Sequence, residues 1–462
     1  MTFGSLRKGT GVALLAGALA GSCTGFGGSG PPDVVLIVVD TLRADHLTQY
    51  GYGRETSSAL AEFSSAATRF SNAYSTSSWT QPAVSSLLTG LLPSRHGVVK
   101  QSTKLPAELA SLPSTLSEAG WQTAGFSGNL FIGEKTAFDR GFEHFQGHGG
   151  KVLVYPDIAD MIAKVDFWQA DVWDHGRPVF LYFQPMNCHG PYRVPAEHRK
   201  DLLGYDPDRT FDYNDSVMTA ILKDGDIEAR DRVTPEYLES LTDQYDTAVR
   251  YSMDAVAALL ATLKKEGIYD DALVIVTSDH GEELFEHGGF GHAYSLFEEV
   301  VRIPLWIKLP GQREGSVVDA PVSLIDLMPT ILDAAGLPAL EGLDGLSLAP
   351  LLEDGSAPGF RGRPIVADTR WKRRAVATAV RLGSYKLIEI ESDYSGRADE
   401  RLLFDLEADP AELVDLAVSE PEKAAALSQA LERTLALDGS SIETEAATGL
   451  DLDVLRALGY VD

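Results

Sequence analysis

The chain has 462 residues and a formal net charge of −28, and 44% of its residues are hydrophobic and 23% charged. This composition is typical of a folded protein with one large and one smaller domain, and it excludes a disordered chain. The negative charge argues against nucleic acid as a partner, because no basic stripe offsets the phosphates.

The N-terminal 23 residues are predicted to be an export signal. Arg7 and Lys8 precede an apolar run that ends at Ala20, is short for a membrane span and is followed by small residues. The segment Leu19 to Cys23 resembles a bacterial lipoprotein signal, in which Cys23 is lipidated and becomes the first residue of the mature protein. We therefore expect an exported lipoprotein that faces the periplasm or the cell surface, with simple secretion as the alternative.

Residues 24–32 are rich in Gly and Ser and are predicted to be a flexible tether. With Cys23 used for lipid, Cys188 is the remaining cysteine, so no disulfide within the chain is expected. No later stretch is long and apolar enough to predict a membrane helix. The expected contact with a membrane is therefore the N-terminal lipid anchor alone.

From Asp33 onward, strand patterns and helix patterns alternate along the chain. Apolar runs predict strands at Val34 to Val39, Thr68 to Tyr74, Trp121 to Ser127, Pro178 to Gln184 and around Val274 to Val276. Helical patterns lie at Glu55 to Arg69, Trp79 to Gly90, Leu112 to Ala119, Tyr237 to Lys265 and Ser323 to Ala335. The alternation predicts an α/β domain with a mostly parallel central sheet and helices on both faces.

A second, smaller unit is predicted at the C-terminus. The stretch after Ala335 becomes richer in Gly and Pro through Pro364, so we place the large domain at residues 33–350 and the subdomain at residues 351–462. Short apolar segments spaced like an antiparallel sheet lie at Pro364 to Ala367, Ala375 to Arg381, Tyr385 to Ile390 and Arg401 to Leu406. A helix from Pro421 to Leu437 is expected to cover them, which makes this unit an α+β subdomain.

Polar side chains follow the predicted strands at the point where each strand ends. Asp40 follows the first strand, and Asp279 and His280 follow the run Val274 to Val276. Since the carboxyl ends of parallel strands meet at one edge of a sheet, these three side chains are expected to converge there. Carboxylates and an imidazole suit Zn or Mn, and three protein ligands leave positions open for catalysis. A solvated loop is the alternative for an isolated Asp-His pair.

Several segments resemble successive motifs of the sulfatase family, within the alkaline phosphatase superfamily. They are Val34 to Leu47 (VVLIVVDTLRADHL), Ser78 to Gly90 (SWTQPAVSSLLTG), Pro93 to Val98 (PSRHGV), Thr277 to Glu283 (TSDHGEE), Gly291 to Pro304 (GHAYSLFEEVVRIP) and, as the C-terminal signature, Phe404 to Leu416 (FDLEADPAELVDL). The resemblance implies an alkaline-phosphatase-like α/β sandwich with a metal at the carboxyl edge of its sheet. It also implies a small C-terminal subdomain that contains an antiparallel sheet.

The chain departs from the sulfatase pattern at the nucleophile. Sulfatases carry Cys or Ser, any residue, Pro, Ser and Arg, and oxidise the first to formylglycine, whereas this chain has Thr80-Gln81-Pro82-Ala83-Val84. Ser127-Gly128-Asn129 stands where the family has a lysine. Thr80 instead resembles the metal-bound threonine nucleophile of phosphodiesterases and of phosphoglycerol or phosphoethanolamine transferases. A helix N-cap is the alternative role for this threonine.

The expected cofactor is one divalent ion, Mn, Zn or Ca, and a second ion is less favoured. Two-metal phosphodiesterases use an Asp upstream of the histidine that matches His189, where this chain has Gln184 and Asn187. The resemblance gives the metal four ligands: Asp40, Asp279, His280 and Thr80.

The same resemblance assigns the remaining site residues. His189 and His292 match histidines of the family's motifs and are expected to protonate the departing oxygen, and binding of a second metal is their alternative role. Arg43, Arg95 and Asn129 are candidates for substrate binding. For the two arginines, bracing of loops is an equal alternative.

The expected function is that of an exported metal-dependent hydrolase in which Thr80 attacks a phosphomonoester or phosphodiester, giving a phosphothreonine that water hydrolyses. The substrate is expected to be a small-molecule, glycan or lipid-headgroup ester. Three alternatives remain: a sulfate-ester hydrolase that works without formylglycine, a lipid-headgroup transferase of the phosphoglycerol or phosphoethanolamine type, and a non-catalytic binding lipoprotein.

Overall fold

A computed structural model describes residues 30–101, 103–148, 155–199, 216–221, 228–355, 357–371, 375–391, 399–436 and 444–446. The predicted export signal, Cys23 and most of the predicted tether lie outside these residues. In the part of the chain that the structure describes, no helix combines the length and the apolar character that crossing a membrane requires.

The centre of the described molecule is a nine-stranded sheet in the order β10-β2-β9-β6-β1-β5-β3-β4, with β11 paired to β2. Its strands are β1 (Val34–Val38), β2 (Thr68–Tyr74), β3 (Gln122–Ser127), β4 (His144–Gln146), β5 (Val179–Gln184), β6 (Leu273–Thr277), β9 (Arg302–Lys308), β10 (Val317–Val318) and β11 (Val322–Ser323). β1 is parallel to β5 and β6, whereas β9 is antiparallel to β2 and β6. The predicted mostly parallel sheet is confirmed.

The strands β1 and β6 lie at the middle of the sheet because their sequences suit a strand that is covered on both faces. Every residue of both strands is buried, and β-branched side chains pack well on such a surface. Successive side chains of β1 point to opposite faces of the sheet. Val35 and Ile37 pack in the hydrophobic core on one face, and Leu36 and Val38 pack in the core on the other.

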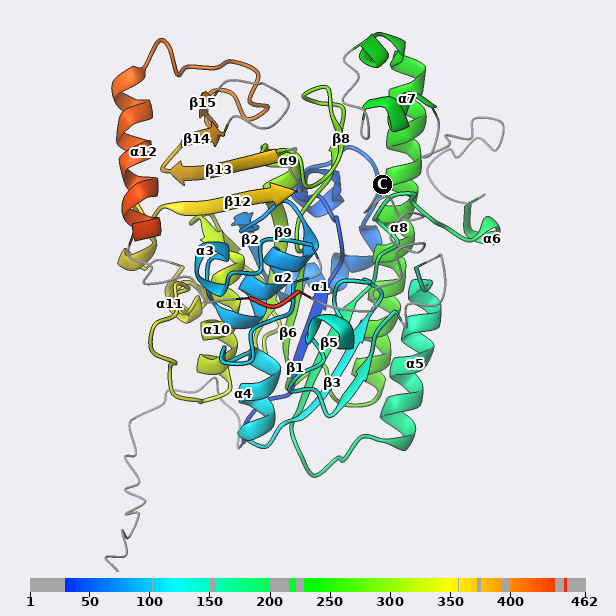
Figure 1. The fold of residues 1–462 in the computed structure, drawn as a ribbon. Coiled ribbons are helices and arrows are strands. Elements are labelled where there is room, and N and C mark those ends of the chain that lie inside the picture. The colour runs from blue at the N-terminus through cyan, green and yellow to red at the C-terminus, as the bar shows by residue number, and fades with distance from the viewer. Residues whose placement is uncertain are drawn as a thin grey trace, which may run out of the picture.

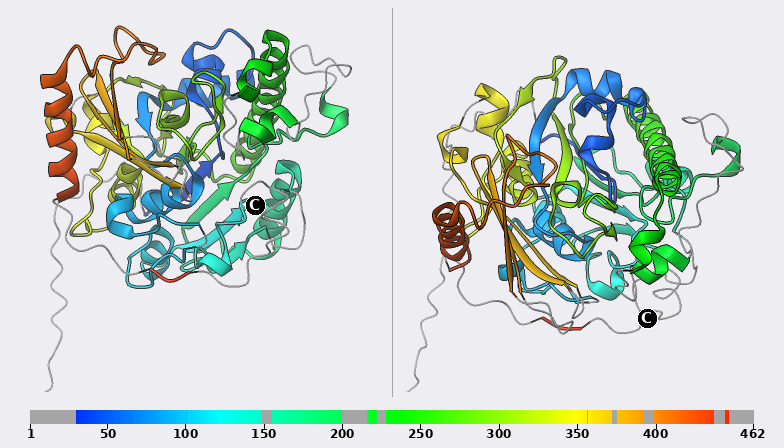
Figure 2. Two further views of the ribbon diagram at one scale, coloured as in Figure 1. Left: turned by 45° about the horizontal axis from the view of Figure 1, so that its top comes forward. Right: turned by 90° about the horizontal axis from the view of Figure 1, so that it is seen from above.

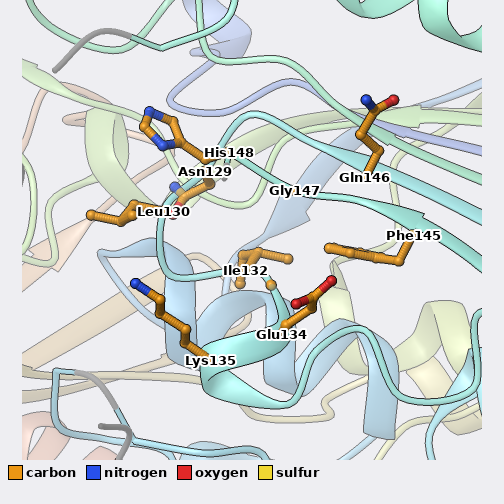
Figure 3. Close-up of a pocket in the computed structure, with 10 residues that line it drawn as sticks. Asn129, Leu130, Ile132, Glu134, Lys135, Phe145, Gln146, Gly147 and His148 are labelled. Atoms are coloured by element: carbon orange, nitrogen blue, oxygen red, sulfur yellow. The ribbon is translucent and has the colours of Figure 1, made fainter. Parts of the chain in front are cut away.

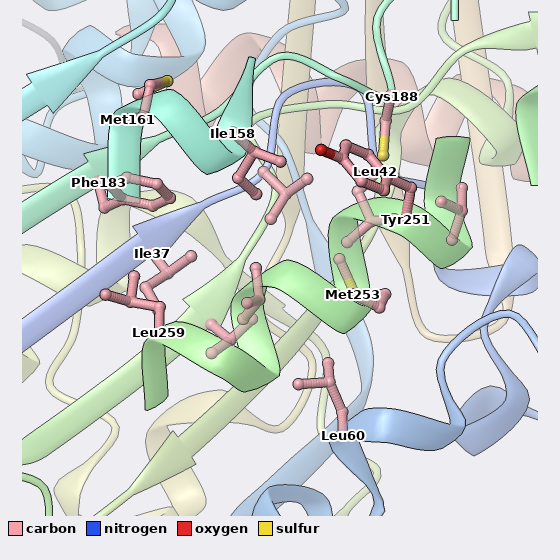
Figure 4. Packing of buried hydrophobic residues seen from close by; sticks show 14 of the residues in the cluster. Ile37, Leu42, Leu60, Ile158, Met161, Phe183, Cys188, Tyr251, Met253 and Leu259 are labelled. Carbon is pink, nitrogen blue, oxygen red and sulfur yellow. The ribbon is translucent and has the colours of Figure 1, made fainter. Parts of the chain in front are cut away.

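Helices cover both faces of the sheet, α5 and α8 on one side and α2, α4 and α10 on the other (Figure 1). Their bounds are α2 (Thr80–Thr89), α4 (Leu112–Glu118), α5 (Ile158–Asp171), α8 (Pro235–Lys265) and α10 (Leu327–Ala334). The long helix α8 begins after Thr234, whose hydroxyl accepts the Tyr237 N–H and caps the helix. Figure 4 shows Met253 and Leu259 of α8 in the same apolar core as Ile37 of β1.

Shorter elements complete the large unit: α1 (Ala61–Ala66), α3 (Pro93–His96), α6 (Ala196–Arg199), α7 (Ser216–Thr219), α9 (Glu298–Val301), α11 (Ala349–Asp354) and the pair β7 (Glu283–Leu284) and β8 (Phe290–Gly291). The prediction of one helix from Glu55 to Arg69 is wrong. A 3₁₀ turn at Ser58–Leu60 and α1 form there, and the chain then becomes extended because Thr68 enters β2.

The C-terminal unit is an antiparallel sheet of β12 (Ile365–Trp371), β13 (Ala375–Leu382), β14 (Tyr385–Ile390) and β15 (Glu400–Asp405) in sequential order. The helix α12 (Pro421–Ala436) covers its outer face, as Figure 2 shows. The predicted small antiparallel subdomain is confirmed. Leu351 and Phe360, which lie beyond the predicted boundary at residue 350, still pack in the core of the large sheet.

Candidate active site

Three of the predicted metal ligands converge at the carboxyl edge of the central sheet. Asp40 follows β1, and Asp279 and His280 follow β6, so the parallel pairing of these two strands brings the three side chains together. Their ligand atoms all lie within 4.8 Å of one another, and all three residues are fully buried. Thr41 has a φ of 56°, in the left-handed region, which turns the chain directly after Asp40. We call Asp40, Asp279 and His280 the strand-end cluster.

The strand-end cluster has the donors and the unbalanced charge that suit a divalent cation. Asp40 Oδ1 and Asp279 Oδ2 are buried without a hydrogen-bond partner among the described residues. Burial, with repulsion from Asp279 as the next cause, raises the pKa of Asp40 well above its usual value, and burial raises the pKa of Asp279 to about 7. A cation fits here because it would pair the two orphan oxygens and offset the two negative charges.

His280 is held in the form that binds metals. Its Nδ1 lies 2.9 Å from the Gly281 carbonyl oxygen, and because a carbonyl can only accept, the proton lies on Nδ1. This leaves the lone pair on Nε2, which lies 3.3 Å from Thr80 Oγ1. Burial lowers the pKa of His280 and favours the neutral ring. A neutral imidazole whose second nitrogen donates to the backbone is a typical metal ligand.

Thr80 is the first residue of α2, and its hydroxyl faces the strand-end cluster. Thr80 Oγ1 lies 3.4 Å from Asp40 Oδ2 and 3.3 Å from His280 Nε2. The N-cap alternative for Thr80 is wrong, because Trp79 holds the cap position and no side chain caps the helix. The threonine is almost completely buried, so its hydroxyl is oriented by these protein groups rather than by bulk water.

The side-chain amides of Asn129 and Gln184 donate hydrogen bonds to Asp40. Asn129 Nδ2 donates to Asp40 Oδ2 at 2.8 Å and to Thr80 Oγ1 at 3.1 Å. Gln184 Nε2, at the end of β5, donates to the same Asp40 oxygen at 3.3 Å. Ser127 fixes the Gln184 side chain by donating to its Oε1 at 3.1 Å. Asp40 therefore receives hydrogen bonds from neutral groups that carry no charge to balance its own.

The two predicted acid histidines lie beside the strand-end cluster. The ring centroid of His292 is 4.6 Å from that of His280 and 4.8 Å from that of His189. Burial lowers the pKa of His189 to about 3, and burial together with His280 lowers the pKa of His292 well below its usual value. Both imidazoles are therefore neutral in the free protein at neutral pH.

Two residues next to these histidines received no role from the sequence. Tyr155 OH lies 3.0 Å from His189 Nδ1, and Glu282 Oε1 lies 3.4 Å from His292 Nδ1. Glu282 is fully buried, and burial raises its pKa. Its place two residues after His280, at the same strand end, was a usable signal. Tyr155 lies near no recognised motif, and the sequence contains no comparable signal for it.

The arginines proposed to bind substrate are engaged elsewhere. Arg43 is buried and donates to Asp45, to Glu286 at 2.6 Å and to the Glu282 carbonyl at 3.0 Å. Arg95 pairs with Asp344 at 2.7 Å and donates to the Gly342 carbonyl oxygen at 2.6 Å. Their contacts are those of braces between loops.

A second group of one histidine and two carboxylates lies between the large unit and the C-terminal sheet. His287, Glu299 and Glu412 also have ligand atoms within 4.8 Å of one another. His287 stacks on Phe297 with ring centroids 3.6 Å apart, and its Nε2 lies 3.5 Å from Glu299 Oε1. Lys386 Nζ lies 2.9 Å from Glu412 Oε1. We call His287, Glu299 and Glu412 the subdomain cluster.

Two family models match this chain. The model described as Sulfatase matches residues 32–337, which is more than half of the chain, and the one described as N-sulphoglucosamine sulphohydrolase, C-terminal, matches residues 285–438. The chain belongs to the sulfatase family. Its members are ester hydrolases that typically bind a divalent metal, so this protein is a sulfatase-family hydrolase with an acidic and histidine site suited to a metal.

Named relatives extend over most of the sulfatase-family chain. Choline-sulfatase of Rhizobium meliloti is 26% identical over 444 residues, covering 84% of this chain and 83% of the relative. A solved structure in complex with its substrate D-glucosamine-2-N,6-O-disulfate shares 20% identity with a TM-score of 0.72, covering 88% of this chain and 99% of that one. The phosphonate monoester hydrolase from Silicibacter pomeroyi shares 23% identity with a TM-score of 0.69, covering 88% and 96%. These structures confirm the sulfatase-like fold.

Proposed function

We propose that this sulfatase-family protein hydrolyses phosphate esters, with Thr80 as the nucleophile and one divalent cation held by Asp40, Asp279 and His280. The observation that carries the proposal is the position of Thr80 Oγ1, 3.4 Å from Asp40 Oδ2 and 3.3 Å from His280 Nε2. Bound among these groups, a cation would lower the pKa of the hydroxyl and offset charge on the phosphoryl oxygens.

The chain's own groups prepare Thr80 for attack. The hydroxyl donates to Asp40, while Asn129 donates to the hydroxyl oxygen, so both the proton and the oxygen are held in place. The first turn of α2 leaves backbone N–H groups without helical partners, and the helix dipole is positive at this end. An anionic phosphoryl group is therefore favoured beside Thr80.

The reaction has two displacements at phosphorus. In the first, Thr80 Oγ1 bonds to phosphorus as the bond to the leaving oxygen breaks, and the hydroxyl proton passes to a neighbouring base. In the second, water attacks the phosphothreonine, the threonine oxygen regains a proton and the phosphate is released. A diester would release a monoester in this second step.

The departing oxygen needs a proton, which we assign to the pair of His292 and Glu282. Burial raises the pKa of the Glu282 carboxyl and lowers that of His292, which favours the neutral form of each group in the free protein. An anionic ester beside the ring would favour the imidazolium form, because opposite charges attract strongly in a buried site. His189 lies on the other side of His292 and would shield the pair from water.

A sulfate ester is the second candidate substrate. Family membership favours it, as do relatives whose names state sulfatase activity. Thr80 disfavours it, since sulfatases form their nucleophile from Cys or Ser. A lipid-headgroup transferase would share the first displacement and use an alcohol in place of water, so identification of the second product distinguishes it from a hydrolase. A binding lipoprotein would show no turnover at all.

Export and lipidation of Cys23 form a separate part of the proposal. The basic residues, the apolar run and the small residues before Cys23 support them. Incorporation of labelled palmitate into the full chain, lost in Cys23→Ser, is the expected result. Label that persists in this variant would contradict lipidation at Cys23.

The proposal is tested by paired turnover on residues 30–462. The hydrolysis of p-nitrophenyl phosphate, bis-p-nitrophenyl phosphate and p-nitrophenyl sulfate is measured with Mn, Zn or Ca added singly. Turnover of a phosphate ester that exceeds sulfate turnover and is abolished by Thr80→Ala is the expected result. Sulfate turnover that survives Thr80→Ala would contradict the proposed nucleophile and substrate together.

A further inference from the structure

A cavity of about 370 Å³ reaches Asn129, a hydrogen-bond partner of Thr80. It is lined by Asn129, Leu130, Ile132, Gly133, Glu134, Lys135, Phe145, Gln146, Gly147 and His148. Asn129 links this cavity to the reacting atoms, because its amide donates to Thr80 Oγ1 at 3.1 Å. The volume lies in the range of small-molecule sites, about 300 to 1,000 Å³.

The chain keeps this space open with glycine. A Cβ placed on Gly133 would meet only the Phe145 ring, at 3.9 Å. The backbone at Gly133 is extended, with a φ of −177°, so a larger residue can adopt this conformation. A side chain at Gly133 would therefore project into the cavity without straining the chain, which offers a way to fill it.

Lys135 places a positive charge at this cavity. The side chain is exposed, and among the described residues it forms no ion pair or hydrogen bond. Figure 3 shows Lys135 on the side of the cavity where Asn129 and Leu130 lie, while the Glu134 carboxylate points toward Phe145 on the opposite side. Glu134 therefore does not neutralise Lys135.

We propose that this cavity binds the leaving alcohol of the ester, and that Lys135 selects substrates whose alcohol carries a second negative charge. This inference rests on the proposed function, since it takes Thr80 to be the point of attack. The walls match such an alcohol. Phe145, Leu130 and Ile132 offer apolar contact, Gln146 offers polar contact, and Lys135 offers a positive charge on the side away from the Glu134 carboxylate.

The test compares two esters that differ in the charge of the alcohol: phenyl phosphate and 4-carboxyphenyl phosphate. The variants are Lys135→Gln and Lys135→Glu, with Lys265→Gln as the control because Lys265 is an exposed lysine at the far end of α8. Lys135→Gln is expected to lower kcat/KM for the carboxyphenyl ester about two- to fivefold more than for the phenyl ester, mainly through KM, as for an exposed ion pair. Lys135→Glu should widen this difference, and Lys265→Gln should leave the ratio of the two esters as in the parent.

A pocket-filling variant tests the location independently. Gly133→Val is expected to raise KM for both aryl esters, while inhibition by inorganic phosphate keeps its inhibition constant because phosphate needs only the Thr80 end of the site. Equal loss of both esters in Lys135→Gln, or unchanged KM values in Gly133→Val, would overturn the inference.

Failure of the proposed function gives a different pattern. If the parent protein hydrolyses neither phosphate ester, the same variants are measured with phenyl sulfate and 4-carboxyphenyl sulfate. A preference for the carboxyphenyl sulfate that depends on Lys135 would keep the cavity assignment and reject the phosphate substrate. Absence of that preference with both ester types would overturn the role of Lys135.

Discussion

The strand-end cluster and the subdomain cluster contain the same residue types, but their charges are balanced in opposite ways. In the strand-end cluster, the side-chain donors to Asp40 are neutral groups: the amides of Asn129 and Gln184 and the Thr80 hydroxyl. Both clusters contain buried carboxylate oxygens without a hydrogen-bond partner among the described residues, so the difference lies in the nearby cation. In the subdomain cluster, Lys386 Nζ lies 2.9 Å from Glu412 Oε1. A histidine with two carboxylates therefore indicates a metal site only where their charge is left uncompensated.

The subdomain cluster also holds a proton. Burial raises the pKa of Glu299 to about 9, so this carboxyl is neutral at pH 7. Lys386 is buried and also pairs with Glu298 at 3.0 Å. Lys386 therefore offsets one of the two charges of Glu412 and Glu298, and the protonated Glu299 adds none. Its expected role is to join the C-terminal sheet to the loop that follows the strand-end cluster.

The largest expected difference between the two clusters is in catalysis. Thr80→Ala removes the nucleophile and should lower kcat on the order of 10³-fold or more while leaving the circular dichroism spectrum unchanged. Thr89→Ala on the same helix is the matched control, because among the described residues its hydroxyl bonds to the Ser85 carbonyl alone. A similar loss of kcat in both variants would show that Thr80 acts through the helix and not through its hydroxyl.

Metal content is the next contrast. Asp279→Asn removes one of the two charges of the strand-end cluster and should reduce bound metal from about one ion per chain to none, because a carboxylate is a much stronger ligand than an amide. Glu412→Gln in the subdomain cluster should leave metal content unchanged. Elemental analysis after gel filtration measures both. Metal lost from Glu412→Gln but kept in Asp279→Asn would reverse the assignment of the two clusters.

The third contrast is in the free energy of unfolding, where a substitution at the subdomain cluster should have the larger effect. Lys386→Met leaves Glu412 and Glu298 without their cation and is expected to cost about 3–5 kcal/mol of unfolding free energy, the usual cost of breaking a buried ion pair. Urea unfolding of metal-free protein measures this loss. Metal binding by the strand-end cluster should persist in the folded variant. An unchanged unfolding midpoint would show that Lys386 is not the balancing charge.

The proton on Glu299 gives a pH dependence with a defined sign. Its pKa is about 9 in the folded protein and has an ordinary value of 4.5, so the folded state binds this proton more tightly. The contribution of this proton to the unfolding free energy is therefore complete below about pH 4.5 and is lost as the pH rises through about 9. Glu299→Gln should flatten the fall in unfolding free energy between about pH 6 and pH 9. The same slope in variant and parent would place the proton elsewhere.

The smallest expected effect concerns Arg95, whose ion pair connects two loops. Arg95→Ala removes a partly exposed ion pair with Asp344 and should cost about 1 kcal/mol or less, with kcat/KM within twofold of the parent. Thermal unfolding and turnover of p-nitrophenyl phosphate measure the two quantities. A large rise in KM with unchanged stability would instead support the predicted substrate-binding role of Arg95.

The sequence predicted the parts of the site that regular structure determines. Asp40, Asp279 and His280 converge because each follows a buried strand and the strands β1 and β6 are neighbours in a parallel sheet. The position of Thr80 was predictable from a helix start within a recognisable motif. The antiparallel C-terminal sheet was predictable from its evenly spaced short apolar segments.

The remaining parts depend on the path of loops, which local patterns do not encode. Arg43 and Arg95 are charged residues within motifs, yet their partners come from loops far away in sequence, Glu286 and Asp344. The subdomain cluster joins His287 to Glu412 across more than a hundred residues. Such contacts follow from how distant loops pack together in the folded chain.

The central claim is that Thr80 carries the phosphoryl group during turnover. Protein mixed with bis-p-nitrophenyl phosphate and the activating metal is quenched in acid within the first turnovers, and peptides are identified by mass spectrometry. We expect a phosphorylated peptide whose modification maps to Thr80 and is absent from Thr80→Ala. Full turnover without any modified threonine, surviving in Thr80→Ala, would contradict it and would assign the attack to water.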